Sequence, residues 1–210
     1  HTWNDLEGRK YAALGTSKAL YIYYEDAFYD ITPLDTAISG ATFTTTNTST
    51  TVTVNKTSHN LELGEYVTFT SVTPPTGAGF VATDFENNTF EVLNVAANTF
   101  DITMPSAATG STSATGSGII NPYVEIGPTI GSTSTQVILD PGSWSLDNFG
   151  QQLIATIKDG KTWVWDAGLS NPLERRAVVM SGAPTASRLT ITSDRDRHVV
   201  HFGTETTIGD

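Results

Sequence analysis

The chain of 210 residues contains no cysteine, which excludes disulfide bonds and thiolate metal sites. It also lacks any apolar run long enough to cross a bilayer as a helix. Basic residues are scarce, because 11 lysines and arginines stand against 22 aspartates and glutamates, giving a net charge of −11. A nucleic-acid-binding surface needs a basic footprint, so this balance argues against one. It leaves open that DNA passes such a surface without being held.

Charged residues (16%) and hydrophobic residues (38%) are both few, and Thr, Ser, Gly and Asn make up the difference. This composition is typical of strand-and-turn proteins on the outside of cells or particles. No amphipathic helix of useful length is predicted. There is no initiating Met and no signal peptide, and both ends fall inside recurring motifs, so we expect a segment of a longer polypeptide.

The stretch from Trp144 to Asp166 predicts an aromatic hairpin. Residues 151–157 are a β-run, and residues 158–161, Lys-Asp-Gly-Lys, predict a two-residue hairpin turn because Asp-Gly readily supplies positive φ angles. Trp163 and Trp165 then share one face of the second strand. Such a hairpin is marginal alone, so we expect it to pack against similar units.

Two other stretches resemble this hairpin. The first thirty residues match it segment by segment: 3–8 with 144–150, 11–14 with 153–156, and 20–23 with 162–165. This alignment places Tyr21 and Tyr23 where Trp163 and Trp165 lie. Residues 198–204 match residues 10–16 as a partial third copy. Repeated antiparallel hairpins predict a propeller or a similar radial architecture. The alternative is that any all-β chain yields hairpins that look alike.

The composition changes near Ser39, where a Thr-rich β-forming run begins. Strands are predicted at residues 51–56, 66–71, 90–95 and 99–103, and a flexible Ser/Gly linker at 107–118. Most aromatic residues here alternate with polar ones, as core positions do; these are Tyr66, Phe69, Phe80, Phe85, Phe90 and Phe100. The predicted fold class is all-β, with partial β-propeller-like antiparallel blades and an inserted small β-barrel. Residues 1–39 and 119–210 form the blade domain, and residues 40–118 form the barrel with its Ser/Gly linker.

Chemistry-bearing residues cluster in two places. Asp194, Asp196, His198 and His201 are the best metal or catalytic candidates, but the odd spacing of the histidines points them to opposite faces of a strand. A solvated hairpin tip at residues 194–197 explains them better. Four aspartates flank the aromatic hairpin, and carboxylates beside tryptophans occur in glycosidase clefts. Each lies at a turn or strand end, where it caps the backbone; these are Asp140, Asp147, Asp159 and Asp166.

The sequence therefore predicts no catalytic residue, no metal site and no cofactor. It predicts instead a set of aromatic residues that pack the blades, with a sugar-binding platform as the alternative for the tryptophans. The set comprises Trp3, Tyr21, Tyr23, Trp144, Trp163 and Trp165.

Several segments carry a resemblance to a known class of proteins. L-G-T-S-K-A-L-Y-I-Y, D-N-F-G-Q-Q-L-I-A-T-I-K-D-G-K-T-W-V-W-D and D-R-D-R-H-V-V-H-F-G-T resemble the blades of phage tail hub or nozzle proteins. S-H-N-L-E-L-G-E-Y-V-T-F, with N-N-T-F-E-V and A-N-T-F-D-I-T, resembles a small β-barrel of tail proteins. That barrel is named for its likeness to the first catalytic cysteine half-domain of ubiquitin-activating enzyme. Because this chain has no cysteine, the likeness implies no enzymatic activity here.

The resemblance implies a non-enzymatic virion structural protein in the tail of a short-tailed phage. It implies a homo-oligomeric ring, with a hexamer as one stoichiometry, that forms part of the DNA ejection conduit. Neighbouring tail adaptor and fibre proteins are the implied partners, and duplex DNA would pass without tight binding. Two alternatives stay open: a carbohydrate- or receptor-binding β-module of a tail spike or adhesin, and a propeller hydrolase. The hydrolase lacks a convergent acid, base and nucleophile.

Overall fold

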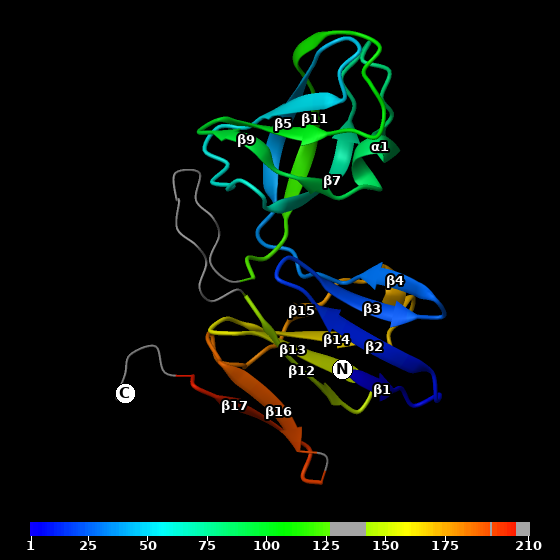
Figure 1. Cartoon of the computed structure of the whole chain (residues 1–210), viewed down its shortest axis with the longest axis vertical. Coiled ribbons are helices and arrows are strands. Elements are labelled where there is room, and N and C mark those ends of the chain that lie inside the picture. Colours follow the sequence, from blue (N-terminus) through cyan, green and yellow to red (C-terminus); the bar gives the residue numbers. More distant parts are fainter. Residues whose placement is uncertain (127–141, 194, 205–210) are drawn as a thin grey trace. The chain divides into compact units, whose positions relative to one another are not determined.

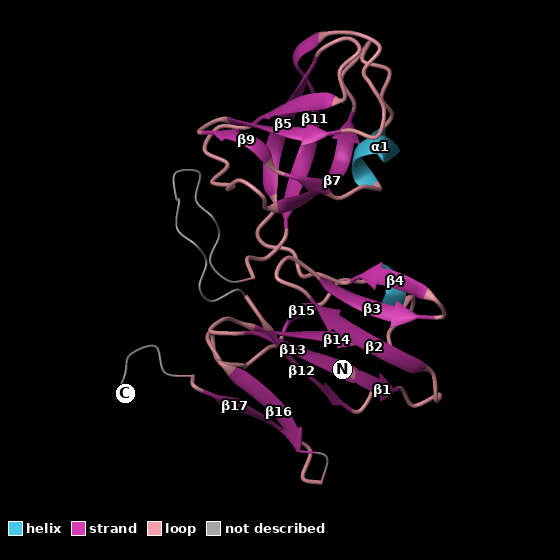
Figure 2. Cartoon of the chain, viewed as in Figure 1, coloured by secondary structure: helices cyan, strands magenta, loops and turns pink. Residues whose placement is uncertain are grey.

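The computed structural model describes residues 1–126, 142–193 and 195–204 (Figure 1). Nearly all of their regular structure is antiparallel β-sheet, which confirms the predicted all-β class (Figure 2). They divide into two compact units. The meander unit comprises His1–Pro33 and the described residues from Val124 onward, and the barrel unit is Leu34–Tyr123.

The meander unit contains two four-stranded sheets in which neighbouring strands follow one another in the chain. The first holds β1 (Thr2–Asn4), β2 (Lys10–Gly15), β3 (Leu20–Tyr24) and β4 (Ala27–Asp30). The second holds β12 (Trp144–Phe149), β13 (Gln152–Ile157), β14 (Thr162–Asp166) and β15 (Val178–Val179), with a 3₁₀ turn, η1 (Pro172–Glu174), before β15. Four antiparallel strands in chain order are also the layout of one propeller blade.

A ribbon of β16 (Leu189–Ser193) and β17 (His198–Phe202) completes the unit. The predicted charged turn at residues 194–197 lies between its two strands, and Asp194 is outside the described residues. The ribbon pairs as β1 pairs with β2, and the predicted partial third copy has no further described strand. Whether it begins a blade stays a prediction.

The two four-stranded sheets share one core. Alternate side chains of the central strands are buried, as the two-residue period of a strand requires. Trp165 lies edge-on to Trp3 and to Tyr11, with ring centroids 6.1 and 5.5 Å apart. The core therefore forms where aromatic residues of one sheet meet those of the other.

The predicted alignment of the two hairpins is wrong by one residue in the second strand. Ala13 pairs with Ile22, and Ala155 pairs with Trp163, so Ile22 takes the place of Trp163. The cause is turn length. Four residues, 16–19, lie between the paired Gly15 and Leu20, whereas three, 158–160, lie between Ile157, which aligns with Gly15, and Lys161, whose carbonyl oxygen accepts the Ile157 N–H. The second turn is therefore not the predicted two-residue type. A one-residue difference moves every following side chain to the other face.

The tryptophans that begin the two motifs are not equivalent either. Trp3 lies opposite Tyr11, in the middle of the ladder between β1 and β2. Trp144 lies opposite Ile157, at the end of the ladder between β12 and β13. No strand was predicted before residue 151, yet residues 144–149 form the six-residue strand β12. Its pairing with β13 is continuous from Trp144 to Phe149. Local similarity between the motifs therefore does not extend to their positions in the sheets.

The barrel unit is a seven-stranded sheet in the order β8-β7-β11-β5-β6-β10-β9. Its strands are β5 (Ile38–Thr45), β6 (Thr51–Asn55), β7 (Tyr66–Thr73), β8 (Phe90–Glu91), β9 (Leu93–Ala96), β10 (Thr99–Thr103) and β11 (Thr112–Pro122). The two edge strands, β8 and β9, are separated in the chain by Val92 alone, so the sheet curls until it nearly closes. The predicted single strand at residues 90–95 is thus two strands.

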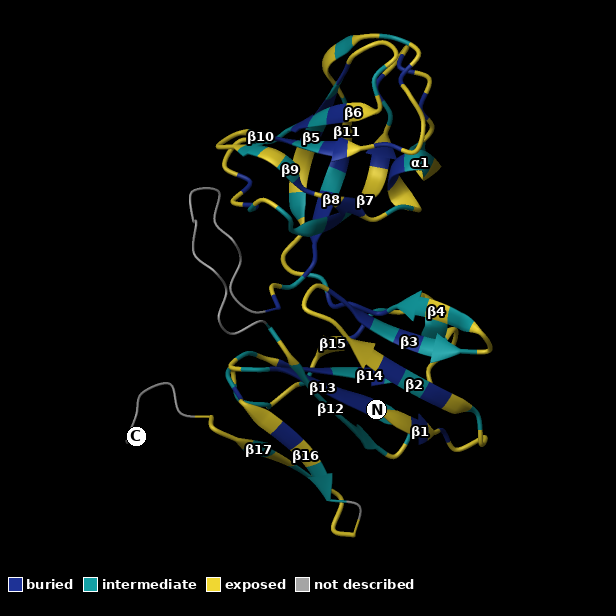
Figure 3. Ribbon diagram, in the orientation of Figure 1, coloured by how far each residue is buried: buried dark blue, intermediate teal, exposed yellow. Residues whose placement is uncertain are grey.

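The buried residues of the barrel unit form one hydrophobic cluster, and buried positions along its strands are dark blue in Figure 3. Phe85, on the short helix α1 (Ala82–Glu86), is fully buried and lies 4.7 Å from Phe43, centroid to centroid. Of the six aromatic residues expected inside, Phe69, Phe80, Phe85, Phe90 and Phe100 are buried, and Tyr66 is half-buried.

The predicted flexible linker at residues 107–118 is wrong over most of its length. Residues 112–122 form β11, which lies between β7 and β5 near the middle of the sheet. Its glycines serve packing: a Cβ on Gly118 would lie 3.1 Å from the Phe43 ring, and Gly116 has φ +74° beside the Thr73 carbonyl oxygen. Glycine in a strand thus marks register shifts and close approach here. The compact unit spans residues 34–123, against the predicted 40–118.

Candidate functional site

The six aromatic residues predicted to pack the blades divide into two groups. Trp3, Trp163 and Trp165 are buried in the shared core. Trp144 is half-buried, and so are Tyr21 and Tyr23, which the one-residue slip places on the opposite face of β3 from the core. Tyr24 faces the core in their stead, and its ring stacks on Tyr11 at 4.8 Å.

The indole N–H groups show what the tryptophans do. Trp3 donates to the Gln151 carbonyl oxygen at 3.1 Å, and Trp144 donates to the Thr16 carbonyl oxygen at 2.9 Å. Each bond joins a strand of one four-stranded sheet to a turn of the other. Trp165 donates to the Pro172 carbonyl oxygen at 3.0 Å. These bonds hold the backbone of the meander unit, and the buried rings of Trp3, Trp163 and Trp165 cannot serve as a sugar platform.

His201 lies in a buried cluster of hydroxyl groups, whereas His198 is exposed on the other face of β17. The Nδ1 atom of His201 is 3.1 Å from Thr190 Oγ1 and 3.3 Å from Ser187 Oγ. Burial lowers the pKa of His201. Ser187 is fully buried, and no carboxylate contacts His201 among the described residues, so the pair lacks both substrate access and an orienting acid.

The aspartates flanking the aromatic hairpin hold the backbone in place. Asp140 lies outside the described residues. The others have these partners: Asp147 with the Thr192 N–H (2.6 Å), Asp159 with Arg188 (3.0 Å) and Asp166 with the Gln152 amide (2.8 Å). No three His, Asp or Glu side chains in the described part of the chain are grouped to hold a metal ion. In the same residues, no helix is long and apolar enough to cross a membrane.

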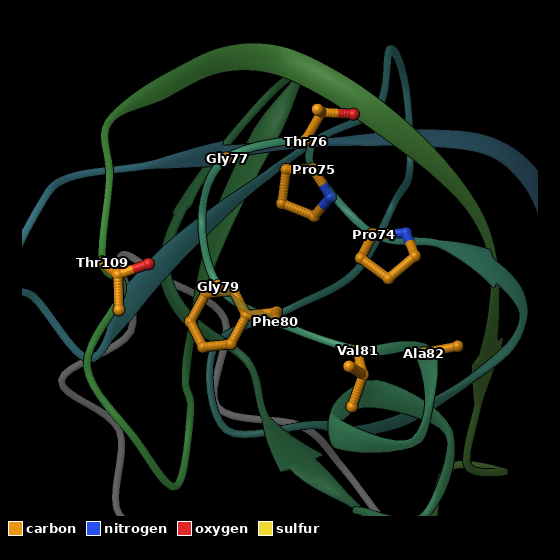
Figure 4. Close-up of a pocket in the computed structure, with 9 residues that line it drawn as sticks. All are labelled: Pro74, Pro75, Thr76, Gly77, Gly79, Phe80, Val81, Ala82 and Thr109. Atoms are coloured by element: carbon orange, nitrogen blue, oxygen red, sulfur yellow. The ribbon is translucent and has the colours of Figure 1, made fainter.

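Two surface hollows are candidates for binding. One lies in the barrel unit between the 74–82 loop and Thr109 (Figure 4). Its lining is made of Pro, Gly, Ala, Val and Phe, and its side-chain polar groups are the hydroxyls of Thr76 and Thr109. It offers no titratable group and little to orient a ligand.

The other hollow, of about 430 Å³, lies on the first sheet of the meander unit. Its lining combines aromatic, polar and charged residues: Thr2, Trp3, Asn4, Lys10, Tyr11, Ala12, Tyr23, Tyr24 and Glu25. Trp3 and Tyr11 belong to the core, so the alternation of strands places Thr2, Asn4, Lys10, Ala12 and Tyr23 on the outer face. This outer-face hollow sets an aromatic ring beside hydroxyl, amide and ammonium groups, a combination found in ligand sites.

Strand register orders the residues of this face into a row. Thr2 pairs with Ala12, Ala12 with Tyr23, and Tyr23 with Phe28. The small Ala12 side chain leaves room between its larger neighbours. The Tyr23 and Phe28 rings lie 5.0 Å apart, and Phe28 is 62% exposed. The outer face thus carries an aromatic surface beside a hollow lined with polar groups.

Comparisons with known proteins place this geometry in no family. No protein-family model and no curated protein matches the chain. Among solved structures, it is similar to the phage phi92 endosialidase, at 17% sequence identity and a TM-score of 0.36. The match covers 88% of this chain and 32% of that protein. At this TM-score the likeness carries no argument about function.

The outer-face hollow was missed in the sequence because the repeat alignment put Tyr21 and Tyr23 in the core. The missed signal was the turn that follows them. Tyr24 pairs with Ala27 across Glu25 and Asp26, both at positive φ, as a type I′ hairpin turn requires. Such turns are usually Asn-Gly, so Glu-Asp gave no turn prediction. Recognising that hairpin would have put Phe28 opposite Tyr23 on one face.

Proposed function

We propose that this chain is a non-catalytic structural component of a phage tail, of the hub or nozzle type. The proposal rests on the blade-like and barrel-like segments of the sequence, and the fold agrees with both expectations. The residues that resemble blades form four-stranded antiparallel meanders, and those that resemble the small barrel form one nearly closed sheet.

The observation that carries the proposal is the way the barrel is inserted. Within the barrel unit, Leu34 pairs with Tyr123, and the Asp35 N–H donates to the Pro122 carbonyl oxygen at 2.9 Å. Within the meander unit, the Val124 N–H donates to the Pro33 carbonyl oxygen at 3.1 Å. The chain therefore leaves and re-enters the meander unit at one point. Blades interrupted by a complete small barrel match the order of segments on which the tail resemblance rests.

We propose no catalytic role, because the candidate catalytic side chains already bond to other groups of the chain. The described aspartates of the aromatic hairpin bond to neighbouring backbone, amide and guanidinium groups, and His201 bonds to buried hydroxyls. In the proposed role the partners are other copies of the chain in a ring, adjacent adaptor and fibre proteins, and duplex DNA in transit. The net charge of −11 suits a wall that does not grip phosphates.

Locating the chain in intact particles tests the proposal. Antibodies raised against the 210-residue chain should label the distal tail in immunogold electron microscopy, and cryo-electron microscopy should place the two units in a ring there. Label confined to spikes or fibres projecting from the tail would favour the carbohydrate- or receptor-binding alternative. Label absent from particles would overturn the assignment to the virion.

A further inference from the structure

The outer face of the first sheet has features that a structural role leaves unused. Phe28 is 62% exposed, although a large aromatic side chain gains free energy from burial. It lies against Tyr23, and the two rings extend the row that leads from Ala12 and the outer-face hollow. Exposed aromatic rings side by side form a rigid apolar surface with little conformational entropy to lose on binding.

The turn beside these rings holds them in place. Glu25 and Asp26 adopt φ values of 46° and 62°, a left-handed conformation that costs free energy for residues other than glycine. One side chain of this turn holds a ring, because the Tyr23 hydroxyl donates a hydrogen bond to Asp26 Oδ1 at 2.8 Å. The bond to Asp26 also raises the pKa of Tyr23. The turn thus fixes the orientation of the Tyr23 ring before any ligand arrives.

The hollow next to the rings offers hydrogen-bonding groups. Thr2, Asn4 and Lys10 are exposed, and their side chains make no bond to any other residue in the described part of the chain. They supply a hydroxyl, an amide and an ammonium group. Lys10 and Glu25 carry opposite charges, so the lining has no net charge. Such a lining suits an uncharged ligand that is rich in hydroxyl groups.

We propose that this outer face binds a neutral carbohydrate, with the Tyr23 and Phe28 rings against the apolar face of a sugar and Asn4, Lys10 and Thr2 bonding its hydroxyls. A nucleic acid fits less well, because one lysine in an acidic chain gives phosphates little attraction. A docked peptide would need apolar pockets for its side chains, which this polar lining does not provide. The site goes beyond the proposed structural role, and its test does not depend on where the chain lies in a particle.

Affinity electrophoresis of the whole chain tests the proposal. Native gels are cast with dextran, galactomannan or mannan as neutral polysaccharides, and with polygalacturonate as an acidic one. At least one neutral polysaccharide should retard the chain. Phe28→Ala and Tyr23→Ala should each weaken that retardation about tenfold, the effect of losing one aromatic contact.

Phe202→Ala is the matched control, because Phe202 is also an exposed aromatic residue of the meander unit, at 45%. It should leave the retardation unchanged. Phe28→Ala removes an exposed side chain and should keep the parental melting temperature, so it remains informative if Tyr23→Ala unfolds. The proposal fails if none of the three neutral polysaccharides retards the chain, if polygalacturonate alone does, or if Phe202→Ala loses as much as Phe28→Ala.

Discussion

The barrel unit and the meander unit contain similar strands but bury their apolar residues differently. In the barrel unit, phenylalanines from β5, β7 and α1 meet inside one curled sheet, with Phe43, Phe69 and Phe85 in mutual contact. In the meander unit the core lies between two open sheets. A nearly closed sheet supplies both walls of its own core, whereas an open meander needs a second sheet to cover it.

The difference also appears at the surface. The ribbon of β16 and β17 has four apolar residues on its outward face, each between 37% and 46% exposed: Leu189, Ile191, Val200 and Phe202. The barrel unit exposes only Leu63 and Val81 among its large described apolar residues. The barrel unit is therefore the better candidate for independent folding, and the predictions below begin with that contrast.

The largest expected effect comes from cutting the barrel unit out at two different boundaries. Residues 34–123 alone should unfold cooperatively in urea, followed by circular dichroism. Residues 40–117 should not, because that fragment lacks Ile120, which is fully buried, and all pairs between β7 and β11 except Ser117 with Thr73. Losing one buried isoleucine costs about 2–5 kcal/mol, a large share of a small domain's stability.

The two fragments also separate explanations. Cooperative unfolding of both would mean that the end of β11 contributes little and that residues 40–117 are enough for the barrel to fold. Failure of both would mean that the barrel unit depends on the rest of the chain. Either result would remove the contrast between a self-sufficient barrel and dependent meanders.

The sequence predicted the parts of this fold that depend on local pattern. Strand β10 has the predicted bounds, and Trp163 and Trp165 share one face of β14 as their spacing required. Alternation also identified Phe69 and Phe100 as core residues. In each case the two-residue period and the residue type agree, so no distant contact was needed for the prediction.

The parts that failed depend on pairing between distant residues. The composition of β11 is that of a linker, and only its partners show why Gly116 and Gly118 lie where a side chain would collide. The slip at Tyr21 and Tyr23 came from one extra residue between Gly15 and Leu20, which pairing alone reveals. The outer-face hollow was not predicted for the same reason, because the misaligned repeat assigned Tyr23 to the core and not to the outer face.

Within the meander unit, the tryptophans test whether the shared core holds the sheets together. Trp163→Ala and Trp165→Ala should each lower the free energy of unfolding by about 3–5 kcal/mol. The Phe variants separate packing from hydrogen bonding. Trp165→Phe leaves the Pro172 carbonyl oxygen without its hydrogen-bond donor. The buried Nε1 of Trp163 has no partner among the described residues, so Trp163→Phe breaks no such bond. Trp165→Phe should therefore lower the free energy of unfolding by about 1–3 kcal/mol more than Trp163→Phe.

Urea titrations of the four variants against the parent give these differences. A Trp163→Ala variant that unfolds like the parent would show that the ring faces solvent, which would revive the sugar-platform interpretation of the tryptophans. Equal losses in the two Phe variants would contradict the hydrogen bond to Pro172.

A smaller, pH-dependent effect is expected at Asp5, in the turn between β1 and β2. Burial raises the pKa of its carboxyl group, but hydrogen bonds from Arg9 and from the Glu7 N–H outweigh it, so the pKa lies below its ordinary value. A lowered folded-state pKa adds stability above the unfolded-state value of about 3.9 and loses it as the pH falls through the folded-state value. Asp5→Asn should therefore destabilise the meander unit near pH 7, with a difference that shrinks below about pH 4.

Melting temperatures of the parent and Asp5→Asn across this pH range provide the check. Glu7→Gln is the matched control, because the Glu7 carboxylate is 73% exposed and pairs with Arg9 at 3.4 Å only at the surface. It should change the melting temperature little at any pH. A constant gap between Asp5→Asn and the parent at all pH values would show that the charge of Asp5 does not matter.

The smallest expected effect is on DNA, where the prediction is no binding at all. Residues 34–123 contain seven acidic side chains and a single lysine or arginine, Lys56. The remainder of the chain contains 15 acidic and 10 basic side chains. Each Lys or Arg contact to a phosphate adds affinity and slows release, so a conduit wall should avoid them. In the meander unit several of these cations are already paired, as in Arg9 with Asp5 and Arg176 with Asp30.

In gel-shift titrations at about 0.15 M salt, neither the whole chain nor residues 34–123 should therefore shift the duplex DNA band. Comparing the two extends the contrast between the units to electrostatics. Micromolar binding of the whole chain alone, falling steeply with salt, would place a basic patch on the meander unit and contradict the conduit function. Binding by the isolated barrel unit would be harder to explain, because one lysine releases too few counterions to offset the repulsion from seven carboxylates.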